Sequence, residues 1–250
     1  HVFRLPNVFG KWCRPNYNSV VATFCHNISR DEPITISDPD RELELVYVDD
    51  VVAEWVKGIG DWGLGTGEPG VVYREVAPSY RVTLGRLAEL IRSFRAMRTT
   101  LLLPDLADEF TRKLYGTYVS YLPEGAFAYD LQQRCDDRGC LAEFVKSRAG
   151  GQIFVSRTRP GITRGNHYHH TKTEKFLVLE GEALIRFRHI LVGGVIEVRV
   201  RGEDFRVVDI PTGYTHSIEN IGQGELVTLF WASEVFDPDR PDTQFMAVQG

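Results

Sequence analysis

The second half of the chain constrains the fold most strongly. From Tyr121 onward, short segments rich in Val, Ile and Phe alternate with turns made of Gly, Pro, Asp and Asn. Such short segments with turns at close intervals are typical of antiparallel barrels and jelly rolls, in which each strand reverses before the next one begins. We therefore predict an all-β domain in this half.

The first half has a different pattern. Apolar residues recur at helical spacing over residues 18–28 and 83–94, and residues 42–48 alternate as a strand does before Asp49 and Asp50, which predict a helix N-cap. The glycine-rich stretch 58–70 follows a helix and lacks a P-loop lysine, so we expect a flexible connection there. These patterns predict an α/β domain over residues 1–118 and an all-β domain over residues 119–250.

The charge and the hydropathy of the chain argue against nucleic-acid-binding and membrane-spanning functions. The chain has 29 Lys and Arg residues against 34 Asp and Glu residues, a formal net charge of −5, so nucleic acid is not an expected partner. No run approaches the roughly 18 apolar residues of a membrane span, and the first residues do not resemble a signal peptide. We therefore expect a cytoplasmic protein without a membrane partner.

The four cysteines, Cys13, Cys25, Cys135 and Cys140, have neither paired CxxC spacing nor the density of a secreted disulfide framework. Free, buried thiols are the expectation for all four.

Histidines cluster in one short stretch of the β-rich half. His167 and His169 are two positions apart and so face the same side of a strand, and Glu174 follows after a polar turn. His216 can come from a distant strand. Three imidazoles and one carboxylate form a suitable ligand set for a divalent transition metal. The set permits zinc, iron, nickel or manganese, and zinc is the metal we expect.

These two stretches resemble the paired signature of the cupin superfamily, G-x5-HxH-x4-E-x6-G and G-x5-PxGxxH-x3-N. The first Gly of the second motif is replaced by Phe205. The resemblance implies a double-stranded β-helix, a jelly roll, in the second half. The matching residues are Gly161, His167, His169, Glu174 and Gly181 in the first motif, and Pro211, Gly213, His216 and Asn220 in the second.

A resemblance over nearly the whole chain is to the CapF family of bifunctional capsular polysaccharide enzymes. It is carried by LPNVFGKWCRPNYNS at residues 5–19, LVYVDDVVAE at 45–54, GITRGNHYHHTKTEKFLVLEG at 161–181 and VDIPTGYTH at 208–216. The resemblance implies a short-chain dehydrogenase/reductase (Rossmann-type) domain followed by a cupin. It further implies C3 epimerisation of a UDP-linked 4-keto-6-deoxy-N-acetylhexosamine by the cupin, NADPH-dependent reduction by the reductase, and a product leading to N-acetyl-L-fucosamine.

The first half departs from the pattern of this family. Neither a GxxGxxG loop nor a Tyr-x3-Lys pair occurs in residues 1–118, and the chain begins at His1 inside a pattern already under way. We therefore expect an N-terminally truncated chain with an incomplete reductase domain, and NADPH as a cofactor of a full-length homologue only. Because cupins often pair through exposed sheet edges, a homodimer is also expected.

Epimerisation needs a base, an acid and stabilisation of the enolate beside the 4-keto group. The candidate proton-transfer residues are His170, Lys175 and Tyr214, although strand alternation turns the first two away from the metal ligands. Residues 164–167, RGNH, also resemble the RGxH pattern of the cupin epimerases of 4-keto-rhamnose synthesis, which implies a base at the histidine. On that pattern His167 is the base, and His169, Glu174 and His216 remain as ligands.

Substrate contacts are expected in both halves. Asn7 and Asn18 match family positions on the sugar-nucleotide side of the reductase domain, while Arg138, Arg157 and Arg164 are candidates for the diphosphate, which a guanidinium binds in bidentate fashion.

Two other functions fit the same residues. A metal-dependent cupin isomerase or dioxygenase of another small molecule uses the same ligands, and a non-catalytic cupin module would bind the sugar nucleotide without turnover.

Overall fold

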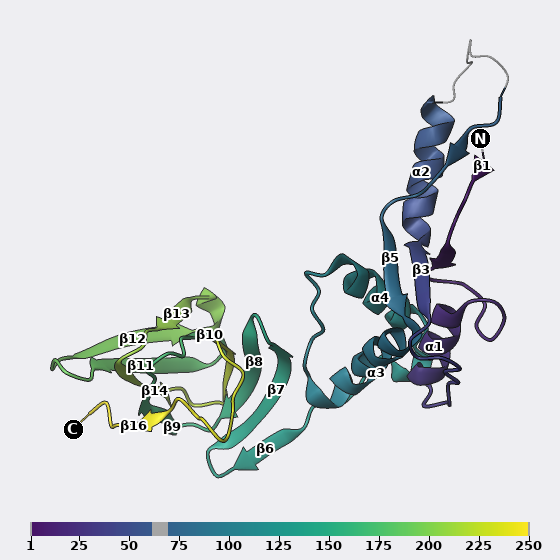
Figure 1. Ribbon diagram of the computed structural model, residues 1–250. Coiled ribbons are helices and arrows are strands. Elements are labelled where there is room, and N and C mark those ends of the chain that lie inside the picture. The colour runs from purple at the N-terminus through teal and green to yellow at the C-terminus, as the bar shows by residue number, and fades with distance from the viewer. Residues whose placement is uncertain (1, 62–69, 250) are drawn as a thin grey trace. The chain divides into compact units, whose positions relative to one another are not determined.

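The structure, a computed structural model, describes residues 2–61 and 70–249. It divides into two compact units, which are described separately (Figure 1). Unit 1 comprises His1–Thr100 and Pro104–Tyr129, and unit 2 comprises Leu101–Leu103 and Asp130–Gly250. The sequence-based boundary lay between residues 118 and 119, within a helix that continues to Ser120. Most of the glycine-rich connection predicted over residues 58–70 lies outside the described residues.

Unit 1 combines helices with small sheets, as predicted for the first half. In its three-stranded sheet, β2 is parallel to β3 and β3 is antiparallel to β5, while β1 and β4 form a separate parallel pair. The strands are β1 (Val2–Phe3), β2 (Asn7–Phe9), β3 (Glu42–Tyr47), β4 (Tyr73–Arg74) and β5 (Ser79–Thr83). The helices are α1 (Val20–Ser29), α2 (Val48–Asp61), α3 (Leu84–Thr100), α4 (Glu109–Ser120) and the 3-10 helix η1 (Glu124–Ala126).

Polar side chains fix the helix starts in unit 1. The Ser19 hydroxyl accepts a hydrogen bond from the backbone N–H of Ala22 at the start of α1, and Asp108 caps α4 in the same way. The predicted cap at Asp49 and Asp50 is wrong by position, because α2 already begins at Val48. The two carboxylates lie in the first helical turn, where they interact favourably with the positive end of the helix dipole.

Unit 2 consists of two antiparallel sheets, which confirms the predicted all-β character of the second half. The six-stranded sheet has the order β13-β10-β15-β8-β7-β6, and the five-stranded sheet has the order β12-β11-β14-β9-β16 (Figure 1). The first sheet contains β6 (Gln133–Asp136), β7 (Gly139–Ser147), β8 (Gly151–Thr158), β10 (Glu174–Glu180), β13 (Val207–Ile210) and β15 (Leu226–Ala232). The second contains β9 (Thr163–Tyr168), β11 (Glu182–His189), β12 (Val195–Arg201), β14 (Tyr214–Asn220) and β16 (Gln244–Phe245), and the 3-10 helix η2 (Gly202–Asp204) follows β12.

Alternating side chains from both sheets fill the interior of unit 2. Phe176 and Phe230 come from the six-stranded sheet, and Ile185, Phe187 and Ile218 come from the five-stranded sheet. All five are buried in one hydrophobic cluster. Burying such side chains contributes roughly 1.5 to 3 kcal/mol each, so this cluster holds the two sheets of the sandwich together.

The expectation of four free cysteines is wrong for two of them. Cys135 and Cys140 face each other across the β6–β7 hairpin and form a disulfide, with Cα atoms 4.1 Å apart. Their spacing of five positions spans a tight hairpin, which places the two residues directly opposite each other. Cys25 is a free and fully buried thiol, as predicted, whereas Cys13 is free but only partly buried.

The described helices include none long and apolar enough to cross a membrane.

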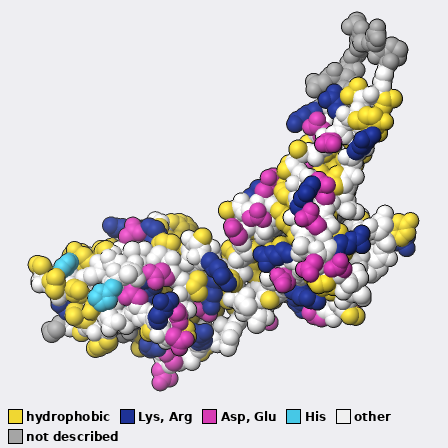
Figure 2. Space-filling view, in the orientation of Figure 1, with side chains coloured by type: hydrophobic (Ala, Val, Ile, Leu, Met, Phe, Trp, Pro, Cys, Tyr) yellow, Lys and Arg dark blue, Asp and Glu magenta, His cyan; other side chains and the backbone are white. Residues whose placement is uncertain are grey.

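On the face drawn in Figure 2, Lys and Arg side chains are interspersed with Asp and Glu. This mixed pattern agrees with the low net charge of the sequence.

Candidate metal centre

Three imidazoles and one carboxylate meet inside unit 2. His167 lies near the end of β9, His169 follows in the loop after it, Glu174 begins β10, and His216 lies in β14. One ligand atom from each residue lies within 4.8 Å of the others. His169, Glu174 and His216 are only 2%, 7% and 1% exposed. The structure therefore brings together the four residues that the sequence predicted as metal ligands.

A β-bulge in β9 places His167 beside His216. In β14, His216 pairs with His167, and the next residue, Ser217, pairs with Gly165. Asn166 therefore has no partner in the ladder, and it adopts a φ of 58°. Gly165 has a φ of 100°, and a Cβ atom there would lie 2.7 Å from the carbonyl oxygen of His216. Only glycine allows this close approach of the two strands.

Hydrogen bonds set the tautomers of the two buried imidazoles. Nδ1 of His169 donates to the backbone carbonyl of Asp242, and Nδ1 of His216 lies 3.3 Å from the carbonyl oxygen of Tyr214. Because a carbonyl only accepts, each Nδ1 carries a proton, and in the neutral form of such a ring the lone pair is on Nε2.

The two Nε2 atoms face the carboxylate without a hydrogen bond. They lie 3.3 Å (His169) and 3.4 Å (His216) from Oε2 of Glu174, and neither has a hydrogen-bond partner among the residues that the structure describes. Buried polar atoms are normally satisfied, so unpartnered nitrogens that converge on a carboxylate need another explanation. A divalent cation among these donors satisfies all of them, and the residues therefore fit a metal ion.

The protonation states also suit metal binding. Burial, assisted by the neighbouring His216 and His169, lowers the pKa of His167 to about 4. Burial opposes ionisation of Glu174, but His169 and His216 outweigh it when their Nε2 atoms carry protons, and they then hold the pKa of this carboxyl well below its usual range. At neutral pH His167 is therefore neutral and Glu174 is ionised, which are the ligand forms of both groups.

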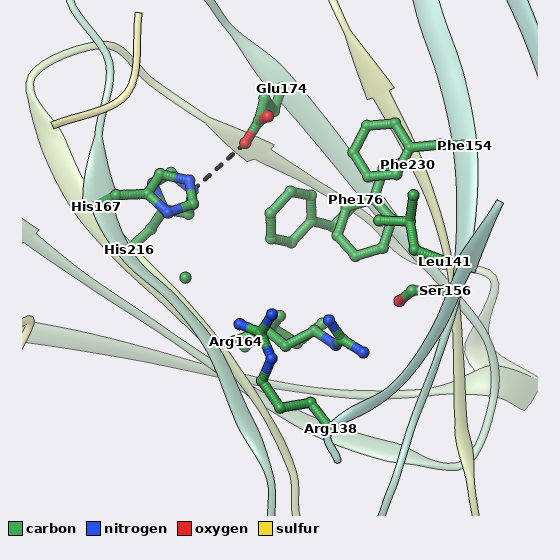
Figure 3. A pocket seen from close by; sticks show the side chains of 12 residues that line it. Arg138, Leu141, Phe154, Ser156, Arg164, His167, Glu174, Phe176, His216 and Phe230 are labelled. Carbon is green, nitrogen blue, oxygen red and sulfur yellow. Dashed lines mark ion pairs between the residues drawn. The ribbon is translucent and has the colours of Figure 1, made fainter. Parts of the chain in front are cut away.

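A cavity of about 250 Å³ is lined by three of the four ligands, His167, Glu174 and His216. Figure 3 shows the imidazoles of His167 and His216 on one side of it, an aromatic wall on another, and the guanidinium groups of Arg138 and Arg164 near each other. The wall contains Phe154, Phe176 and Phe230, of which Phe154 and Phe230 stack with ring centroids 4.8 Å apart. A cavity with apolar walls and a few convergent polar groups is typical of a small-molecule site.

Of the three arginines predicted to contact substrate, Arg138 and Arg164 line this cavity and Arg157 does not. Nε of Arg164 donates to Thr158 Oγ1 at 3.0 Å, while its buried Nη2 atom has no hydrogen-bond partner among the described residues. Burial and the neighbouring Arg138 lower the pKa of the Arg164 guanidinium. Arg157 is exposed and forms an ion pair with Glu225 at 3.0 Å.

The three candidate proton-transfer residues lie away from the cavity wall. His170 is exposed in the loop after β9. The Lys175 side chain is half exposed and pairs with Asp209 of the neighbouring strand, because adjacent strand positions face opposite sides. Tyr214 packs against His189 and the hydrophobic cluster of the sandwich. Strand alternation thus explains why Glu174 faces the cavity and Lys175 does not.

Asn7 and Asn18 lie together, but in unit 1. Both line a cavity of about 320 Å³ whose wall also contains Cys13, Val20 and Leu45. Nδ2 of Asn7 donates to the carbonyl of Glu44 at 3.4 Å. The two asparagines predicted to contact the sugar nucleotide thus share one cavity.

The sequence did not indicate Asp242, whose backbone carbonyl orients His169. Asp242 lies in the segment FDPDRPDT, where frequent Asp and Pro residues are typical of an exposed loop. Nothing in that pattern shows contact with a histidine 73 positions away.

Comparisons with known proteins match this chain over nearly its full length. Residues 134–244 match the family model described as the polysaccharide biosynthesis C-terminal domain. The chain is 47% identical over 248 residues to the Pseudomonas aeruginosa protein named UDP-2-acetamido-2,6-beta-L-arabino-hexul-4-ose reductase, covering 99% of this chain and 65% of that protein.

Two solved structures resemble this one closely. The capsular polysaccharide assembling protein CapF from Staphylococcus aureus has a TM-score of 0.91 and 50% identity, covering 99% of this chain and 66% of that one. A structure of CapF with the inhibitor 3-isopropenyl-tropolone has a TM-score of 0.92 and 50% identity, covering 99% and 70%. This chain thus spans about two thirds of the length of these relatives. By this similarity the chain belongs to the CapF family of capsular polysaccharide biosynthesis proteins.

Proposed function

We propose that unit 2 is a cupin double-stranded β-helix that holds one divalent metal ion, zinc, and epimerises C3 of a UDP-linked 4-keto-6-deoxy-N-acetylhexosamine. The ligands are His167, His169, Glu174 and His216. The observation that carries the proposal is the pair of buried Nε2 atoms, without a hydrogen-bond partner among the described residues, that face Glu174 next to a cavity lined by Glu174 and His216. The name of the Pseudomonas relative, a reductase of a UDP-linked 2-acetamido-hexul-4-ose, supports the substrate class.

The chemistry of the substrate explains the need for a cation. A proton on C3 is acidified by the adjacent 4-keto group, and its removal leaves negative charge on the carbonyl oxygen. When bound, a divalent cation supplies positive charge near that oxygen. The apolar wall formed by Phe154, Phe176 and Phe230 excludes water and so strengthens every electrostatic interaction in the cavity.

The two arginines suit the other end of the substrate. Nη2 of Arg164 is buried and has no hydrogen-bond partner within residues 2–61 and 70–249, and Arg138 lies next to Arg164 at the cavity wall. Phosphate oxygens accept hydrogen bonds from guanidinium groups with good geometry. We assign the diphosphate to Arg138, which also pairs with Asp136, and to Arg164, because both line the cavity, and we leave Arg157 out because it does not.

The position of His167 fits either of two alternative roles, metal ligand or base. As the fourth ligand it completes a set of three imidazoles and one carboxylate. As a base it would leave His169, Glu174 and His216 as the ligands, and its neutral ring at the cavity wall suits this role as well. We assign it as a ligand. A His167→Asn variant separates the roles, because loss of a ligand lowers zinc affinity, whereas loss of a base alone leaves it unchanged.

A non-catalytic sugar-nucleotide-binding module is the second candidate. Epimerisation needs proton transfer on both faces of C3, yet His170, Lys175 and Tyr214 are not among the described residues that line the cavity. The polar side chains at its wall are instead Arg138, Ser156, Arg164 and three of the four ligands. This arrangement favours a binding module unless a cavity residue transfers the second proton.

Product analysis distinguishes the two candidates. The chain is incubated with the UDP-4-keto-6-deoxy-N-acetylhexosamine without NADPH, the 4-keto group is reduced chemically, and the sugars are identified by NMR. An epimerase gives a mixture of the two C3 configurations. A binding module returns one configuration while the UDP resonances still shift on binding.

We propose that unit 1 is the substrate-side part of a Rossmann-type reductase domain, with Asn7 and Asn18 near the sugar nucleotide. Their shared cavity supports this placement. NADPH-dependent reduction is assigned only to full-length relatives, because residues 1–118 of this sequence have no GxxGxxG loop and no Tyr-x3-Lys pair. We therefore expect this chain not to bind NADPH, so the fluorescence of NADPH should be the same with and without the chain.

We further propose a cytoplasmic homodimer. β12 is an edge strand of the five-stranded sheet and exposes Val195 and Ile196, which suits pairing with another sheet edge. Light scattering of the purified chain measures its mass, and twice the 28.4 kDa of the chain is expected.

A further inference from the structure

The last part of the chain runs along the metal-bearing strand. Residues 242–248, here called the strap, contain β16, which pairs antiparallel with β9 and places Phe245 opposite His167. The backbone N–H of Met246 donates to the carbonyl of Asn166 at 2.9 Å, and that of Val248 donates to Oδ1 of the same asparagine at 3.2 Å. The strap therefore holds the bulge that places His167 in the site.

Neighbouring strands hold the far end of the strap. Nε of Arg188 donates to the carbonyl of Val248 at 2.9 Å, and its Nη2 donates to that of Ala247 at 2.7 Å. The Thr215 hydroxyl donates to the carbonyl of Met246. Val248 itself is only 1% exposed. This end is fixed to β11 and β14, the strand that carries His216.

At the other end, the carboxylate of Asp242 is held by the loop that follows His169. It accepts hydrogen bonds from three successive backbone N–H groups, those of His170 at 2.9 Å, Thr171 at 2.8 Å and Lys172 at 2.9 Å. The Thr171 hydroxyl adds a fourth at 3.1 Å. Hydrogen bonds to an ionised acceptor are about twice as strong as neutral ones, so this carboxylate fixes the loop.

The same residue also contacts a ligand directly, since its backbone carbonyl accepts from Nδ1 of His169. That contact directs Nε2 of His169 towards Glu174. In metal sites, an acceptor on the second nitrogen fixes the ring orientation and raises the basicity of the ligand nitrogen. Anchoring by the carboxylate is what keeps this carbonyl in place.

We propose that Asp242 is a positioning residue of the metal centre: by closing the strap on the loop 170–172, it orients His169 for metal binding. The inference rests on the proposed metal site. It goes further by making retention of the metal depend on the C-terminal strap, which lies outside the two histidine motifs. Without the carboxylate the loop and the carbonyl move, and Nε2 of His169 no longer faces Glu174 in the ring orientation that binds the metal.

A purely structural role predicts something different. If Asp242 only anchored the chain end, its loss would lower the stability of the metal-free protein and leave zinc affinity unchanged well below the unfolding temperature. Zinc affinity and metal-free stability are therefore measured separately.

The experiment uses the whole chain with Asp242→Ala, Asp242→Asn and the control Asp239→Ala. Asp239 is exposed in the same segment and is the same residue type, but lies outside the strap. Zinc affinity is measured at pH 7 by competition with a chromophoric chelator, and the unfolding temperature of each metal-free protein is measured by circular dichroism. Zinc alone is the probe, so no turnover is needed.

Asp242→Ala is expected to weaken zinc binding about 10- to 100-fold, the range seen when groups that support metal ligands are removed. Asp242→Asn should lose less zinc affinity than Asp242→Ala, because its amide oxygen can still accept hydrogen bonds from Thr171 and Lys172. Asp239→Ala should have the same zinc affinity as the unchanged chain. If Asp242→Ala does not fold, the Asn variant carries the test alone.

Zinc affinities of both Asp242 variants equal to that of the unchanged chain would overturn the inference and leave the metal centre intact. Absence of zinc binding in the unchanged chain would instead overturn the proposed metal centre, and the inference with it.

Discussion

Nε2 of His216 lies 3.4 Å from Oε2 of Glu174, and this nitrogen has no hydrogen-bond partner among the described residues. Both groups are almost fully buried, in a wall shared with an open cavity. A lone pair and a carboxylate oxygen in this relation repel each other unless a proton or a cation lies between them. The arrangement is therefore costly without an ion and favourable with one.

Removal of His216 tests this relation. His216→Ala should weaken zinc binding more than about 100-fold, because it removes a direct ligand rather than a supporting group. The measurement is zinc per chain by elemental analysis after dialysis. His26→Ala, in unit 1, is the control and should retain the zinc. Equal zinc contents in the His216 and His26 variants would contradict the assignment.

Stability of the metal-free protein should depend on pH through His167. Burial lowers its pKa from 6.5 to about 4, so the unfolded chain binds a proton that the folded chain does not bind between these values. Stability therefore falls as pH drops through this window, by about 2 kcal/mol between pH 7 and pH 5. Urea unfolding at the two pH values measures the change.

Glu174 contributes to the pH dependence in a lower range. Its pKa is depressed, so its contribution is present above the ordinary glutamate value and is lost as pH falls below that value. His167→Asn should therefore remove most of the loss of stability that the metal-free protein shows between pH 7 and pH 5. An unchanged slope in this variant would show that another group titrates there.

Gly165 and Gly161 form a matched pair for testing the bulge. Both have a positive φ, 100° and 73°, so alanine is strained at either position. Only at Gly165 would the new Cβ atom meet backbone, 2.7 Å from the carbonyl oxygen of His216. Gly165→Ala should thus lose stability and zinc affinity, whereas Gly161→Ala should lose about 1 kcal/mol of stability and keep its zinc. Thermal unfolding and zinc titration compare them.

Mutation should separate the binding of the diphosphate by the arginines from the binding of zinc by the metal ligands. Arg164→Met removes the guanidinium whose Nη2 has no hydrogen-bond partner among the described residues, and it should weaken UDP binding roughly 10- to 100-fold with zinc affinity unchanged, since hydrogen bonds to charged groups contribute about 1.5 to 3 kcal/mol. Arg157→Met is the control, because this arginine is exposed and paired with Glu225. Calorimetric titration with UDP measures both. A larger loss for Arg157→Met would place the diphosphate elsewhere.

Lys175 should be dispensable for chemistry. Its side chain pairs with Asp209 on the surface opposite to Glu174, so Lys175→Ala should keep C3 exchange within about twofold, as most surface substitutions have small effects. A rate loss of 100-fold or more would restore Lys175 as a proton-transfer residue.

Much of the site was predictable because its information is local. The positions of His167 and His169, the turn before Glu174 and the motif that ends at His216 all follow from short spacings, and the structure brings these four side chains together. The strand texture after Tyr121 likewise predicted the sandwich. Alternation also indicated correctly that Lys175 faces away from Glu174.

The remaining features depend on contacts that no short pattern encodes. Asp242 meets His169 across 73 positions through its backbone carbonyl, which any residue type supplies. The Cys135–Cys140 disulfide depends on a hairpin whose turn was not predicted. Arg157 and Arg164 both lie in strands, and what separates them is that Arg164 is partly buried and lines the cavity whereas Arg157 is exposed.

The central claim, epimerisation by unit 2, is tested most directly by solvent exchange at C3. The chain and the UDP-4-keto sugar are incubated in deuterated water without NADPH, and C3 is followed by NMR. The proposal predicts deuterium at C3 with the unchanged chain, and no deuterium above the enzyme-free rate with His216→Ala or after chelation. No exchange by a folded, zinc-loaded chain that still binds UDP would contradict the claim and favour a binding module.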